Sequence, residues 1–158
     1  MISQKARYAF KALLGLARVP LGQTLQIREI SEREAIPRAF LEHILLDLKR
    51  LRIVGSRRGK DGGYYLVKAP AELTFGDVLW HIDGPMAPLA CLSRQAYRRC
   101  DDCADEGACS LRAGFAGIFR AHLRVLEGMT FARALELGDA GREAEPGYGS
   151  NPFSGAGI

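Results

Sequence analysis

Cysteine is absent from most of this 158-residue chain, and this absence narrows what the few remaining thiols can do. All four lie close together, in the pattern Cys91-x8-Cys100-x2-Cys103-x5-Cys109. A disulfide framework usually crosslinks distant segments and so spreads its cysteines along the chain. Thiolates gathered in one short stretch instead suit a soft metal or an iron–sulfur cluster.

Long apolar runs are missing as well. No run approaches the roughly 20 residues that span a bilayer, and the N-terminus, MISQKARYAF, lacks the apolar core of a signal peptide. We therefore expect no membrane partner and a cytoplasmic location, where thiols stay reduced. A hydrophobic content of 47% fits one compact domain with an appended element.

Charge is unevenly distributed along the chain. Residues 1–68 hold 14 Lys/Arg against 6 Asp/Glu, whereas residues 69–158 hold 8 against 12. A basic N-terminal half suggests a polyanion partner, although a solvated basic surface would give the same count.

Apolar periodicity predicts three helices in the basic half, at about 4–18, 27–34 and 37–51. Pro37 suits the first position of the third helix. A stripe on that helix faces inward and consists of Leu41, Ile44, Leu45, Leu48 and Leu51. Two helices joined by a short turn, the second charged on its outer face, predict a helix-turn-helix, although an ordinary helical hairpin would look similar.

A β-hairpin is predicted next, with a first strand from Arg52 and a return over 64–67. Its tip, 56–63, is rich in glycine, which allows positive φ at a turn. A basic hairpin after a helix-turn-helix is typical of a wing that reaches phosphates or the minor groove. A P-loop is disfavoured because no Lys-Ser/Thr pair follows the glycines and no helix opens there.

Side chains on these elements are candidate DNA contacts. Phosphate contacts are expected from Arg28, Lys49, Arg57 and Lys60. Groove readers are expected to be Arg38, Glu42 and Arg58, and Glu42 can accept a hydrogen bond from a cytosine amino group.

The remaining half predicts two further helices around the cysteines. One covers 75–82, with Thr74 as N-cap and Trp80, the single tryptophan, expected in core or interface packing. The other covers about 110–126 and carries an apolar stripe expected to pack on a second subunit: Leu111, Phe115, Ile118, Phe119, His122 and Leu126. Packing on its own domain is the alternative. A short helix is expected at 131–137, and the chain from Gly138 onward is expected to be disordered.

Several of these motifs together resemble the IscR-type family of bacterial winged-helix transcriptional regulators. The resemblance covers residues 1 to about 137, and the wing motif Arg58-Gly59-x-x-Gly62-Gly63-Tyr64 is its most specific part. It extends to the opening stretch 3–9, to Ile27-Arg28-Glu29-Ile30-Ser31, to Phe40-Leu41-Glu42, to Phe75-x-Asp77-Val78 and to the cysteine loop. Within the family, the chain is most similar to iron–sulfur-cluster members of the IscR and RirA type.

The resemblance implies a mainly α fold: a winged helix-turn-helix DNA-binding domain (1–84), a cluster-binding loop (85–109), a dimerisation helix region (110–137) and a tail (138–158). It implies a homodimer that acts as a repressor on double-stranded operator DNA. It further implies a [2Fe–2S] or [4Fe–4S] cluster that senses iron, redox state or nitric oxide.

The resemblance also implies a ligand set. Cys103-x5-Cys109 and Cys91 match the three family cysteines, and Cys100 is additional, so Cys91, Cys100 and Cys109 form an alternative set of three. Arg112 and Arg7 occupy the positions where other branches supply a fourth ligand. Cys100 is therefore the natural fourth thiolate.

Other interpretations of the cysteines stay open. They include a structural four-thiolate zinc site, weakened by the single Cys-x2-Cys spacing, and a thiol–disulfide switch between Cys100 and Cys103. A thiol oxidoreductase is disfavoured because no βαβ pattern surrounds that pair, so we predict that the chain is not an enzyme. A winged helix that binds a protein partner remains an alternative to DNA binding.

Overall fold

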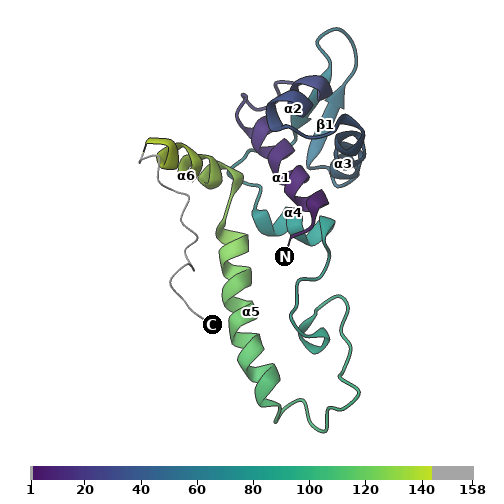
Figure 1. Ribbon diagram of the computed structural model, residues 1–158, viewed down its shortest axis with the longest axis vertical. Helices are drawn as coiled ribbons and strands as arrows, with labels where there is room; N and C mark the ends of the chain where they lie inside the picture. Colours follow the sequence, from purple (N-terminus) through teal and green to yellow (C-terminus); the bar gives the residue numbers. More distant parts are fainter. Residues whose placement is uncertain (1, 144–158) are drawn as a thin grey trace.

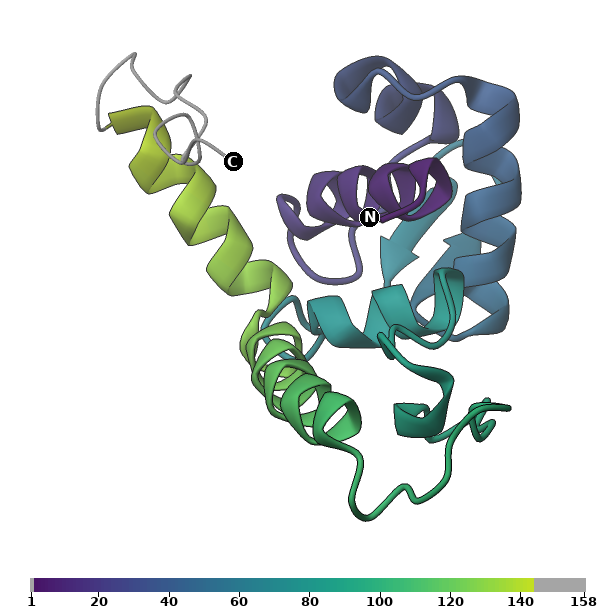
Figure 2. The same ribbon diagram turned by 60° about the horizontal axis from the view of Figure 1, so that its bottom comes forward.

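The computed structural model describes residues 2–143 as a winged helix from which a long helix projects (Figure 1). The elements are α1 (Gln4–Ala17), α2 (Ile27–Glu34), α3 (Arg38–Arg50), β1 (Val54–Arg57), β2 (Gly63–Leu66), α4 (Phe75–Ile82), η1 (Ala90–Leu92), α5 (Ser110–Gly128) and α6 (Phe131–Glu143). Helices α5 and α6 lie on one side of the molecule, away from α3 (Figure 2). None of the helices in residues 2–143 has the length and apolar character needed to cross a membrane.

Helix α1 lies at the centre of the core. Its buried face includes Ala6, Ala9, Ala12, Leu13 and Leu16, each at most 2% exposed. The small alanines let neighbouring helices approach closely, and α1 contacts α2, α3 and α4. Four of the five residues of the predicted α3 stripe complete this core, namely Leu41, Ile44, Leu45 and Leu48. The predicted helix-turn-helix packing is confirmed.

The wing is a two-stranded antiparallel hairpin in which Val54 pairs with Leu66 and Arg57 with Gly63. The first strand begins at Val54 instead of Arg52, because Arg52 is left-handed (φ 56°) and the Ile53 amide still donates to the Leu48 carbonyl at 3.0 Å. Tyr64 also exchanges two backbone hydrogen bonds with Leu25. A Cβ on Gly63 would lie 2.3 Å from the Leu25 carbonyl oxygen, so this bridge requires glycine.

Pro37 is the N-cap of α3 instead of its first helical residue. Its carbonyl accepts the first helical bond, from the Leu41 amide at 3.1 Å, and the helix begins at Arg38. The difference is one residue, which is common at helix ends.

Helix α4 begins with the N-cap predicted from the sequence. The Thr74 hydroxyl accepts from the Asp77 amide at 3.1 Å, and the Asp77 carboxylate accepts from the Thr74 amide at 3.0 Å. This reciprocal capping box satisfies donors that a helix start leaves free.

Replacing Thr74 with alanine is expected to lower the free energy of unfolding by about 1 kcal/mol, because the N-cap acceptor is lost. Urea denaturation followed by circular dichroism measures the change, with Thr74→Ser, which keeps the hydroxyl, as the matched control. Equal destabilisation by both variants would contradict the capping role.

The C-terminal end of α5 is joined to the winged helix by backbone hydrogen bonds. Phe75 donates to the Met129 carbonyl at 2.8 Å, Phe131 to that of Leu73 at 3.0 Å and Ala132 to that of Pro70 at 3.1 Å. The segment between α5 and α6 is therefore fixed against the segment that precedes α4.

Helix α6 continues to Glu143, so the expectations that it ends at Leu137 and that disorder begins at Gly138 are wrong. This part of the helix contains two glycines, Gly138 and Gly141, and each is unfavourable by only about 1 kcal/mol relative to alanine. Tertiary contacts support this part of the helix, including an ion pair of 3.5 Å between Asp139 and Arg18, the C-cap of α1. The rest of the predicted disordered tail, 144–158, lies outside the described residues.

Candidate nucleic-acid interface and cysteine loop

The candidate DNA contacts lie on α2, α3 and the hairpin, which lie together at one end of the molecule (Figure 1). Arg38 and Glu42 occupy the first turns of α3 and form an exposed ion pair of 3.1 Å. Arg28 on α2 pairs with Glu32 at 2.8 Å, and this hydrogen bond raises the pKa of Arg28. These exposed pairs are weak enough to exchange their partners for phosphates or bases.

The end of α3 and the wing carry the other basic side chains. Lys49, near the end of α3, donates to the Ser56 hydroxyl at 2.7 Å and so joins the helix to β1. The Arg57 guanidinium stacks 4.9 Å from the centre of the Tyr65 ring. Arg58 and Lys60 at the tip are exposed and form no ion pair among residues 2–143.

The cysteine loop lies at the opposite end, between α4 and α5 (Figure 1). Cys91 is buried in η1, whereas Cys100 is exposed. Desolvation and, after it, the neighbouring Cys91 thiol raise the pKa of Cys100. Cys103 follows in a turn closed by its amide, which donates to the Cys100 carbonyl at 3.2 Å.

The loop is held by its own side chains. Arg99 donates to the carbonyls of Cys103 and Ala104 at 2.7 and 2.8 Å. The Tyr97 hydroxyl donates to Glu106 at 2.7 Å, and this hydrogen bond raises the pKa of Tyr97. These bonds connect the two sides of the segment that carries Cys100 and Cys103.

Cys109 is the N-cap of α5. Its sulfur accepts from the Arg112 amide at 3.4 Å, so this thiol lies directly on the helix start. The Arg112 Nε is buried with no hydrogen-bond partner among residues 2–143. A buried N–H without an acceptor is unfavourable, and an anionic group held by the adjacent thiols would supply one.

The structure thus places Cys91 near Cys100 and holds Cys103 in a backbone turn with Cys100. Within residues 2–143, no three or more possible ligands already surround a metal position. The donor chemistry nevertheless fits an iron–sulfur cluster, because all four thiols are free and Arg112 offers an unused donor.

The expected dimerisation stripe divides into two faces of α5. Phe119 is buried, and Leu126 and Phe115 are partly buried on their own chain, whereas His122 is exposed. Leu111 and Ile118 are 60% and 66% exposed, and Val125, which sequence reasoning missed, is 65% exposed. The signal that could have found Val125 is the repeat of seven residues at 111, 118 and 125, with Gly114 and Ala121 between.

Comparison with known proteins gives the family. The family model described as iron-dependent transcriptional regulator, Rrf2, matches residues 2–136. An rrf2-like HTH-type transcriptional regulator of Rhodobacter capsulatus is 49% identical over 142 residues, covering 88% of this chain and 95% of that protein. The HTH-type transcriptional regulator IscR of Photorhabdus laumondii is 30% identical over 102 residues, and the match covers 65% of this chain and 62% of that protein.

Among solved structures, CymR, the global cysteine regulator of B. subtilis, superposes with a TM-score of 0.72. It is 26% identical in sequence, and the match covers 87% of this chain and 97% of that one. The fold and the relatives are those of transcriptional regulators and not of enzymes. With its winged helix at one end and its cysteine loop at the other, the chain belongs to the Rrf2 family of transcriptional regulators.

Proposed function

We propose that this regulator binds double-stranded operator DNA as a homodimer and represses transcription, and that its cysteine loop controls the binding. The observation that carries the proposal is the arrangement of the chain: a basic winged helix at one end and four free thiols at the start of α5 at the other. The resemblance to IscR-type proteins and the family description support it. Such a protein would act in the cytoplasm.

The candidate DNA contacts divide into two groups in this proposal. Arg57, Lys60, Arg28 and Lys49 neutralise phosphates, whereas Arg38, Glu42 and Arg58 meet base edges. The Arg38–Glu42 pair must open or rotate toward the groove, since both side chains now satisfy each other.

Replacing Lys60 with glutamine is expected to weaken binding to all duplexes alike and to reduce the slope of log K against log salt by about 1, because one phosphate contact is lost. Glu42→Ala is expected to change preference among operator sequences instead. Fluorescence anisotropy with specific and scrambled duplexes separates the two effects. If Glu42→Ala leaves operator preference unchanged in a competition assay, the proposed role of Glu42 as a groove reader is wrong. Duplex binding that does not depend on salt concentration would favour a protein partner over DNA.

An iron–sulfur cluster is the proposed sensor, held by Cys91, Cys100, Cys103 and Cys109. When bound, it supplies a redox-active centre that responds to iron supply, oxidant or nitric oxide. The chain contributes the thiolates, the closed turn around Cys100 and Cys103, and the Arg112 donor at the helix start. Because Cys109 caps α5, a change at the loop alters the beginning of the helix whose far end is joined to the winged helix.

The exposed face of α5 is the proposed dimer interface. Leu111, Ile118 and Val125 lie on one face of the helix, and Gly114 has no atom within 4 Å of the position that a Cβ would occupy. Small residues between large apolar ones allow two helices to approach closely, as in knobs-into-holes packing. Of the residues predicted from the sequence, Phe119 and Leu126 then stabilise the protomer, while Leu111 and Ile118 contact the partner and His122 lies beside them.

A thiol–disulfide switch is the second candidate, and the proximity of Cys100 to Cys91 and Cys103 favours it. Cys100 lies near Cys91 and is joined to Cys103 by a backbone turn, so either thiol can be its partner in the proposed disulfide. Anaerobic purification followed by a visible spectrum and by iron, sulfide and zinc analysis tests the candidates. Matching amounts of iron and sulfide support the cluster, and one zinc per chain supports a structural site. Protein that contains neither iron nor zinc supports the disulfide switch.

A further inference from the structure

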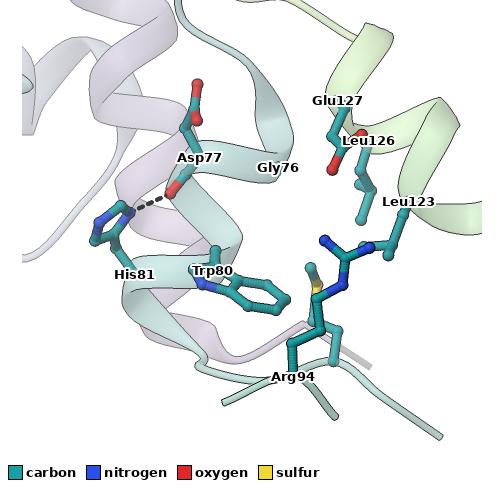
Figure 3. Close-up of a pocket in the computed structure, with 9 residues that line it drawn as sticks. Gly76, Asp77, Trp80, His81, Arg94, Leu123, Leu126 and Glu127 are labelled. Atoms are coloured by element: carbon teal, nitrogen blue, oxygen red, sulfur yellow. Dashed lines mark hydrogen bonds between the residues drawn. The ribbon is translucent and has the colours of Figure 1, made fainter. Parts of the chain in front are cut away.

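A hollow between α4, the cysteine loop and α5 is not used by the proposed DNA or cluster chemistry. Its volume is about 250 Å³. Its apolar wall consists of Trp80, Met86, Leu123 and Leu126. Figure 3 shows the Trp80 ring, Arg94, Leu123 and Leu126 pointing toward one another. The His81 ring points away, and its Nδ1 donates to the Asp77 carbonyl at 2.6 Å. The space suits one ring or a branched chain, since pockets for drug-sized ligands measure roughly 300–1,000 Å³.

An arginine-lined groove adjoins this hollow. Arg94, Leu123 and Glu127 line both, and Arg120 and Arg124 of α5 line only the groove. Across residues 2–143, these three arginines form no ion pair, although six other arginines of the chain do. Guanidinium groups without carboxylate partners beside an apolar space favour a ligand that has an anionic end.

The net charge of the residues that line the hollow and the groove indicates whether a singly or a doubly charged anion fits better. Three guanidinium groups against the carboxylates of Asp77 and Glu127 leave one positive charge. This balance matches a carboxylate monoanion better than a phosphate dianion, because Glu127 repels further negative charge.

We propose that this hollow and groove form a binding site for a small carboxylate with an apolar body, such as an arylacetate. The apolar body lies against Trp80 and Leu123, and the carboxylate accepts hydrogen bonds from Arg94, Arg120 or Arg124. Such a ligand bridges α4, the cysteine loop three residues after Cys91, and α5. Its action as a second input to DNA binding rests on the proposed function, whereas its binding does not.

Trp80 is the only tryptophan, so its fluorescence reports on this site directly. Titrating the full chain with phenylacetate, excited at a wavelength that tyrosine does not absorb, is expected to give a saturable change. Phenylacetamide has the same body without the charge and is expected to bind at least about tenfold more weakly, because charge-assisted hydrogen bonds are lost. Benzyl phosphate is expected to bind more weakly than phenylacetate.

Arg124→Gln is expected to weaken phenylacetate binding about tenfold, and Arg133→Gln on α6 is the matched control that leaves it unchanged. Circular dichroism confirms that each variant is folded. Equal affinity for phenylacetate and phenylacetamide would overturn the anion site. A fluorescence change that follows protein concentration and not phenylacetate would show instead that a second copy covers the hollow.

Discussion

Phe131→Ala is expected to lower the free energy of unfolding by about 3–5 kcal/mol, which is a large part of the stability of a typical domain. The Phe131 side chain is fully buried although it belongs to the last helix. Its ring centre lies 5.7 Å from that of Phe10 in α1 and 5.1 Å from that of Phe75 in α4. Removing the ring leaves a cavity among three elements that cannot all move inward.

Urea denaturation of Phe131→Ala and of Leu137→Ala measures this effect. Leu137 lies on the same helix and is 47% exposed, so its truncation is expected to change the free energy of unfolding by less than about 0.5 kcal/mol. Equal losses in the two variants would mean that α6 contributes through helix content alone, and that Phe131 does not belong to the core.

The position of Phe131 bears on regulation, because it lies where α5 meets the winged helix. Helix α5 has 19 residues and is about 28 Å long, so its N-cap Cys109 lies at one end and the segment that leads to Phe131 of α6 follows the other. We therefore expect Phe131→Ala to weaken the connection between the loop and the recognition helix as well as the fold.

Much of the winged helix could be predicted from the sequence because its signals are local. The apolar stripe of α3, the Thr74 cap and the glycines of the wing each follow from residues a few positions apart. The bounds of α2 and α4 agree with the prediction to the residue. Where a predicted boundary is wrong by one or two residues, the local backbone conformation is the cause. The left-handed conformation of Arg52, for example, delays the start of β1 to Val54.

The candidate site was harder to predict because its geometry depends on long-range packing. Sequence spacing paired Cys100 with Cys103, and the fold of the loop also brings Cys91, which lies nine residues earlier, near Cys100. The stripe on α5 was correctly recognised as apolar, but only the packing of α4 against α5 determines that Phe119 and Leu126 face inward while Val125 faces outward. The length of α6 likewise depends on its contacts with α1.

The cysteine variants are expected to have the second large effect, the complete loss of visible absorption. Cys109→Ser is the sharper variant, because serine is a favoured N-cap and keeps an acceptor for the Arg112 amide while it removes the thiolate. The start of α5 is thereby preserved, so loss of colour reports ligation and not unfolding. Cys103→Ala is expected to be colourless as well, and Ala104→Ser, next to it in the loop, is the matched control that keeps the cluster.

Each variant is purified without oxygen and its visible spectrum, iron and sulfide are compared with those of the unaltered chain. Loss of absorption in Cys103→Ala and Cys109→Ser, with full absorption in Ala104→Ser, assigns both thiolates as ligands. Retention of the full cluster by both cysteine variants contradicts the ligand assignment. Cys100→Ser then decides the role of the additional thiol: loss of absorption makes it the fourth ligand, whereas an intact cluster means that Cys91, Cys103 and Cys109 hold the cluster without it.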